Sequence, residues 1–111
     1  MTHDLPIACD LTAIKADERP HHEALTYRLF SAVQEVHELP DGYGFRLPLE
    51  MLLTTAEFVS RERLCCPFFR FRLEIEPAGA ALWLHLAGNE EIKQFVQASL
   101  VNTLTTTKQG A

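Results

Sequence analysis

Apolar side chains recur along the chain at two spacings, and the change from one to the other marks where helices give way to strands. From Leu25 to Val36 they recur every three or four positions, which predicts a helix that begins near Pro20 and continues to about Leu39. The turn-forming residues at 40–42 then stop this helix.

A second helix is predicted from Leu49 to Cys65. Apolar positions line one face of it, and a further apolar row of Met51, Phe58 and Cys65 runs at seven-residue steps. Because this leaves only a narrow polar strip, we expect cover on more than one side, from the sheet and from a second helix or a partner subunit. Pro67 disfavours helical geometry at the residue before it, so the helix should end at Cys65.

Alternating apolar and polar positions predict the strands. Residues 5–12 are expected to form a first strand and residues 43–47 a second, whereas residues 69–76 and 81–86 form an antiparallel hairpin around a four-residue loop. If Glu76 pairs with Ala81, each face of the hairpin is matched. One face then pairs Ile75 with Leu82, Leu73 with Leu84 and Phe71 with Leu86, and the other pairs Glu74 with Trp83 and Arg72 with His85.

A third helix is predicted after Gly88, with Asn89 as its N-terminal cap. Its apolar stripe contains Ile92, Phe95, Val96, Ser99 and Leu100. The order strand, helix, strand, helix, strand, strand, helix predicts an α+β two-layer sandwich, with the second and third strands parallel through a right-handed crossover. Residues 1–111 are expected to form a single domain whose tail, residues 103–111, is frayed.

Composition and charge narrow the classes of function. Hydrophobic residues make up 47 % of the 111 residues and charged ones 23 %, as in an autonomously folding domain. The formal net charge of -5 argues against nucleic acid as a partner. The sequence has neither an apolar stretch of membrane-spanning length nor a signal peptide, so we expect a cytoplasmic protein without membrane association.

The candidate chemistry is carried by Cys9, Cys65 and Cys66. An odd count that includes two neighbours argues against a disulfide framework, so reduced thiols are expected. Thiolate sulfur is the donor preferred by soft ions such as Cu(I), Zn(II), Hg(II) and As(III). Adjacent helical side chains diverge by about 100°, but Pro67 releases Cys66 from the helix, so both sulfurs can turn toward one pocket. The metal ligands predicted are therefore Cys65 and Cys66, with Cys9 as a third if the first strand lies beside them.

Two other interpretations of the cysteines stay open. In the first, they pack as small hydrophobic residues in an interaction or scaffold domain, which self-associates through the helix at 49–65 or through the face that carries Trp83. In the second, they serve thiol redox or nucleophilic chemistry. The helix C-terminus at Cys65 disfavours thiolate, whereas neighbouring guanidinium groups would favour it if they face the pair: Arg61, Arg63 and Arg70.

Other polar residues give weaker signals. The sequence has no carboxylate pair, Ser-His-Asp set or nucleotide-binding loop, so we predict no catalytic residue and no organic cofactor. The residues His21-His22-Glu23 are expected to form a solvated first turn, because adjacent side chains do not share a helix face. Glu62 is expected to pair with an arginine or to serve as a carboxylate ligand. His85 should be discouraged from protonation by Arg72 across the strands.

The segment from Glu62 to Phe71, with its string Glu-Arg-Leu-Cys-Cys-Pro-Phe, resembles a family of small bacterial proteins of about this length. The resemblance extends to the segments around Cys9, Leu39–Phe45 and Leu82–Gly88, and so covers most of the chain. It implies an association with heavy-metal resistance, with Cys65, Cys66 and Cys9 as the functional thiols, and it supplies no established catalytic assignment. The expected function is soft-metal binding for buffering, sensing or detoxification.

Overall fold

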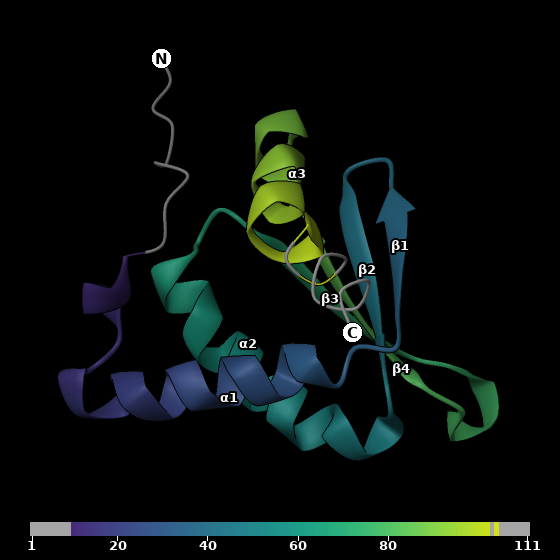
Figure 1. Cartoon of the computed structure of the whole chain (residues 1–111), viewed down its shortest axis with the longest axis horizontal. Helices are drawn as coiled ribbons and strands as arrows, with labels where there is room; N and C mark the ends of the chain where they lie inside the picture. The colour runs from purple at the N-terminus through teal and green to yellow at the C-terminus, as the bar shows by residue number, and fades with distance from the viewer. Residues whose placement is uncertain (1–9, 103, 105–111) are drawn as a thin grey trace.

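The structure, a computed structural model, describes residues 10–102 and 104. Its regular elements are three α-helices and four β-strands, together with short 3-10 turns and a π-helical turn, Gln97–Val101, that follows the last helix (Figure 1). In chain order they are α1 (Arg19–Ser31), β1 (Glu35–Leu39), β2 (Gly42–Leu47), α2 (Leu52–Cys65), β3 (Arg70–Ile75), β4 (Leu82–Ala87) and α3 (Glu90–Val96).

The four strands form one sheet in the order β1-β2-β4-β3, and each neighbouring pair is antiparallel. This confirms the α+β class, while the element order differs from the one predicted. The second and third predicted strands, β2 and β3, do run in the same direction, but they are not neighbours. Strand β4 lies between them and pairs antiparallel with both, so the expected shared direction of β2 and β3 is confirmed.

The register of the β3–β4 hairpin is the one predicted. The amide of Glu76 donates to the carbonyl of Ala81 at 2.9 Å. All five predicted pairs follow, from Ile75 with Leu82 to Phe71 with Leu86. The two faces of this hairpin have different chemistry, and a shift of one residue would exchange them, so the side-chain pattern specifies a single register.

The first predicted helix is too long. Helix α1 ends at Ser31, and residues that were expected to continue it form β1, which pairs with β2 from Glu35↔Arg46 to Leu39↔Gly42. The turn at Pro40 and Asp41 therefore closes a hairpin rather than ending a helix. Pairing with β2 satisfies the backbone of residues 35–39 and overrides their helical spacing.

Part of the N-terminal prediction lies outside the described residues. Residues 5–9 of the expected first strand, including Cys9, are not described, and Leu11–Ala13 form a 3-10 turn instead of a strand. Of the tail expected at 103–111, only residue 104 is described. The described segment at Asp10 does reach the site of interest, since its amide donates to the carbonyl of Cys65 at 2.8 Å.

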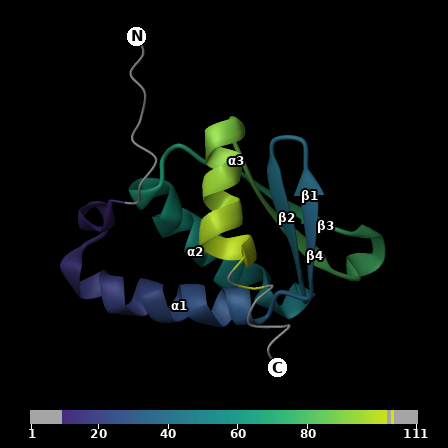
Figure 2. The ribbon, with the colours of Figure 1, turned by 45° about the horizontal axis from the view of Figure 1, so that its top comes forward.

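All three helices lie on one side of the sheet, as both views of the ribbon show (Figures 1 and 2). The sheet face toward them carries fully buried apolar side chains, among them Phe45, Leu82, Leu84 and Leu86. The opposite face carries Trp83 and His85 and has no helix over it in the described part of the chain.

Even so, His85 is only 8 % exposed, because its imidazole lies over Gly44 on the neighbouring strand. A side chain at position 44 would come within 2.7 Å of that ring. Burial, and next the charge of Arg72, lower the pKa of His85, in line with the predicted effect of that arginine. Among the described residues, no helix combines the length and the apolar character that a membrane crossing requires.

A candidate metal centre at the end of helix α2

The two neighbouring sulfurs lie on the same side of the backbone. Helix α2 ends at Cys65, as predicted, and Cys66 has the non-helical angles φ -129° and ψ 66°. As a result, the Sγ atoms of Cys65 and Cys66 are 3.7 Å apart, although a continuous helix would have separated them. Pro67 is the local cause, because its ring disfavours helical geometry at the preceding residue.

The prediction that His22 lies in a solvated turn is wrong. His22 is 4 % exposed, and its ring stacks on Phe58 of helix α2 with 5.7 Å between ring centroids. The neighbouring residues His21 and Glu23 are exposed, as expected. His22 points into the contact between α1 and α2, so the two helices bring an imidazole to within reach of the cysteines.

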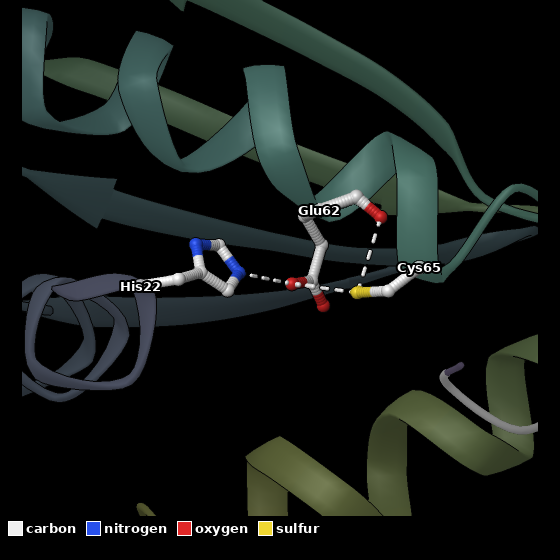
Figure 3. Close-up of side chains that lie close together, drawn as sticks. All are labelled: His22, Glu62 and Cys65. Carbon is white, nitrogen blue, oxygen red and sulfur yellow. Dashed lines mark hydrogen bonds and ion pairs between the residues drawn. The ribbon is translucent and has the colours of Figure 1, made fainter. Parts of the chain in front are cut away.

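The carboxylate of Glu62 lies at the centre of this group (Figure 3). Its Oε1 is 2.9 Å from His22 Nε2 and 3.6 Å from Cys65 Sγ, and its Oε2 is 3.3 Å from Cys66 Sγ. One donor atom from each of His22, Glu62 and Cys65 can be chosen so that all three lie within 4.8 Å of one another. The site therefore combines nitrogen, oxygen and sulfur from two helices.

The predicted partner of Glu62 was an arginine, and this also proves wrong. Arg61 pairs with Glu57 at 2.8 Å and with Glu18 at 3.3 Å, and Arg70 pairs with Asp41. These guanidinium groups are thus engaged with other acids, and the charged groups that raise the pKa of Cys65 are themselves acids, Glu62 first and Asp10 after it.

Burial, and next the negative charge of Glu62, raise the pKa of the Cys65 thiol to about 12. Cys65 is only 1 % exposed, so little water remains to stabilise a thiolate. At neutral pH the side chain is a thiol that lies within donor distance of the carbonyl and the carboxylate of Glu62. Such a group is a poor nucleophile, but a cation can replace its proton.

The two described cysteines differ in state. Cys65 is a free thiol, as expected, whereas Cys66 is disulfide-bonded, which departs from the expectation of reduced thiols throughout. Cys9 lies outside the described residues, so its expected place as a third ligand stays a prediction.

A pocket of about 320 Å³ opens beside the site. Its wall includes the polar groups of the site, so an ion has a route to them from solvent. The lining residues are Leu11, His22, Glu23, Thr26, Tyr27, Glu62 and Cys65.

One feature of the sequence does indicate the burial of His22. It lies three residues before Leu25 and seven before Leu29, so it belongs to the apolar stripe of its helix, and both of those leucines are fully buried. A histidine in such a stripe faces the interior. No comparable signal shows that the stripe packs against the last turns of α2.

Comparisons of the chain with models of protein families, with curated proteins and with solved structures find no match. The interpretation of this site accordingly depends on its geometry and chemistry.

Proposed function

We propose that the protein binds a soft or borderline metal or metalloid ion at Cys65, with His22 and Glu62 as further ligands. The observation that carries the proposal is the convergence of three different donor atoms within 4.8 Å at a largely buried position. His22 and Cys65 are 4 % and 1 % exposed, and the Glu62 side chain is 16 % exposed. These groups are each other's polar partners away from water, and a cation at their centre would coordinate all three in place of those mutual contacts.

The donor set favours an ion of intermediate softness. Imidazole, carboxylate and thiolate are all ligands that Zn(II) accepts, whereas Cu(I), Hg(II) and As(III) depend more on sulfur. The site as described therefore matches Zn(II) best, and binding of the softer ions would rely on additional thiols.

Reduction of Cys66 would provide such a thiol. Two sulfurs bound to the same tetrahedral zinc at about 2.3 Å each are separated by roughly 3.8 Å. The observed distance between the Sγ atoms of Cys65 and Cys66 is 3.7 Å. The ligand set then grows to His22, Glu62, Cys65 and Cys66, with Cys9 as the further candidate that the sequence suggests.

The raised pKa of Cys65 gives the site a pH response. Because the thiol is protonated at neutral pH, each ion that binds must displace a proton, and affinity rises with pH. A bound dication also reverses the local electrostatics, since the charge of Glu62 that disfavours thiolate becomes part of the ligand shell. This behaviour suits an ion buffer or sensor in the cytoplasm, the location expected from the sequence.

Burial of the cysteines supports a second candidate, an interaction or scaffold domain in which they only pack. Cys65 and Cys66 are 1 % and 0 % exposed and belong to the same core cluster as Phe58 and Phe69. A thiol enzyme has less support, because a cysteine with its pKa raised to about 12 is a weak nucleophile at neutral pH.

Titration of the reduced, metal-free protein separates the two candidates. The ions are Zn(II), Cu(I), Hg(II) and arsenite, and bound ion and free thiols are counted together. We expect stoichiometric zinc uptake that is lost in Cys65→Ser and weakened about 10-fold or more in His22→Gln. Glu23→Gln is the matched control, since Glu23 lines the same pocket without belonging to the donor group. Absence of uptake, or uptake that Cys65→Ser leaves unchanged, would favour the packing role.

A further inference from the structure

Strand β3 lies at an edge of the sheet and exposes side chains on both faces. It pairs only with β4 among the described strands, and four consecutive residues, from Arg72 to Ile75, are exposed. Leu73 and Ile75 are 38 % and 49 % exposed, although they belong to the face that elsewhere forms the core. An edge that presents apolar side chains and unpaired backbone groups is a template for another strand.

The backbone direction on this edge follows from the hairpin. The amide of Glu76 points toward β4, where it donates to Ala81. Because the pattern alternates along an antiparallel strand, the amides and carbonyls of Phe71, Leu73 and Ile75 point away from β4. These three residues offer the hydrogen-bonding groups that an incoming strand would use.

The sequence of the edge is complementary to its own reverse. Around Leu73, the residues one step away are Arg72 and Glu74, and those two steps away are Phe71 and Ile75. An antiparallel copy centred on Leu73 therefore places Arg72 opposite Glu74 twice and Phe71 opposite Ile75 twice. Charged pairs lie on one face and apolar pairs on the other, and the apolar face is the one that pairs with Leu82, Leu84 and Leu86 in the chain's own hairpin.

Neighbouring registers fail this test. Opposite residues in an antiparallel pair share a face, so each residue can change its partner only in steps of two residues. Such a step moves the centre of the pairing by one residue, to Arg72 or to Glu74. A pairing centred on Arg72 would place Arg72 against its own copy, and one centred on Glu74 would do the same with Glu74. Of the three, only the register centred on Leu73 avoids like charges opposite each other.

The charged groups at the centre take no part in the ion pairs of the described residues. Within the described part of the chain, neither Arg72 nor Glu74 forms an ion pair. Arg70, by contrast, pairs with Asp41, and Glu76 accepts a hydrogen bond from Trp83 at 2.7 Å. The choice of pairing register at this edge therefore depends on Arg72 and Glu74.

We propose that β3 binds a second copy of this chain about a two-fold axis at Leu73. The product is a dimer with one continuous sheet of eight strands, four from each copy. Main-chain hydrogen bonds from Phe71, Leu73 and Ile75 join the copies, and the Arg72–Glu74 pairs set the register. A two-fold interface is self-complementary by symmetry, which is the property that this sequence shows. The proposal is independent of any bound ion.

Charge exchange provides a specific test by sedimentation velocity across a concentration series. In Arg72→Glu, or in Glu74→Arg, both cross-strand pairs become repulsive, and we expect each single variant to weaken dimerisation about 10-fold or more. The double variant Arg72→Glu/Glu74→Arg restores complementarity and should dimerise like the original chain. An equimolar mixture of the two single variants should form the mixed dimer. Arg28→Glu, an exposed charge reversal on α1, is the matched control and should have no effect.

Two outcomes would overturn the proposal. One is a chain that stays monomeric throughout the series, and the other is a dimer that neither single variant weakens, since it would use another surface or another register. Hydrogen exchange gives an independent readout on the same samples, because the Leu73 and Ile75 amides should become protected as concentration rises. Protection of these amides at every concentration in a chain that stays monomeric would show that a segment of the same chain covers the edge.

Discussion

Ionisation of Cys65 is the property of the site that tests its burial and its charge together. The pKa is raised from an ordinary value of 9.0 to about 12, so at pH 9 only about one thiol in a thousand should be ionised, where an unperturbed cysteine is half ionised. A difference of about three pH units corresponds to roughly 4 kcal/mol in favour of the protonated form.

The assay is a pH titration of thiolate absorbance in the ultraviolet, which does not require a reagent to reach the buried sulfur. Cys9→Ser/Cys66→Ser leaves Cys65 as the sole cysteine, and a further Cys65→Ser variant supplies the baseline for tyrosine ionisation. We expect almost no thiolate at pH 10, whereas the same protein in denaturant should be mostly ionised there. A native midpoint near pH 9 would refute the reasoning.

The two causes can be separated in the same assay. Glu62→Gln removes the neighbouring charge but leaves the burial, so the Cys65 midpoint should fall and still remain above the ordinary value, because burial is the larger cause. Glu23→Gln, which changes an exposed acid at the pocket wall, should leave the midpoint unchanged. If Glu62→Gln returned the midpoint to the ordinary value, charge and not burial would be the dominant cause.

Two further predictions concern stability. Because the pKa of His85 is lowered in the folded protein, the unfolded chain binds more protons than the folded one as the pH falls below the ordinary histidine value of about 6.5, and the free energy of unfolding should fall from pH 7 to pH 5. Urea denaturation at fixed protein concentration should show a smaller fall in His85→Gln, and an equal fall would contradict the assignment to His85. Phe58 is 1 % exposed and packs against His22 and Phe30, so Phe58→Ala should cost about 3–5 kcal/mol of unfolding free energy, and a cost below about 1 kcal/mol would show that it is not a core residue.

How far the sequence predicts the fold depends on how many constraints act on each segment. The β3–β4 register can be predicted from the sequence because the side chains on both faces must match at once, from Ile75 with Leu82 to Arg72 with His85. The end of α2 can be predicted because Pro67 disfavours helical geometry at its immediate neighbour, Cys66. Both signals are local, and both are confirmed.

The errors arise where tertiary contacts choose between two acceptable patterns. Val36 fits the helical row that contains Leu29, yet residues 35–39 pair with β2. Likewise, Leu53 lies in the expected apolar face of α2 but is 82 % exposed. The buried residues of α2 are Thr55, Phe58 and Cys65, and the last two belong to the seven-residue row, because Phe58 packs against His22 and Phe30 of α1 on that side.

The candidate site, too, could be predicted only in its local part. Adjacency of Cys65 and Cys66 and their release by Pro67 could be predicted from the sequence, and the short distance between the sulfurs agrees with that prediction. The contribution of His22 could not, because it requires α1 to dock beside the last turns of α2, 40 residues away along the chain. Long-range docking of this kind leaves no local pattern in the sequence.

The central claim concerns which atoms hold the ion, and X-ray absorption at the zinc edge measures this directly. The sample is the Cys9→Ser/Cys66→Ser protein loaded with one equivalent of zinc, in which Cys65 is the sole sulfur ligand that a cysteine can supply. We expect one sulfur at about 2.3 Å together with nitrogen and oxygen at about 2.0–2.2 Å. A shell of nitrogen and oxygen alone, or a protein that retains no zinc, would contradict the account.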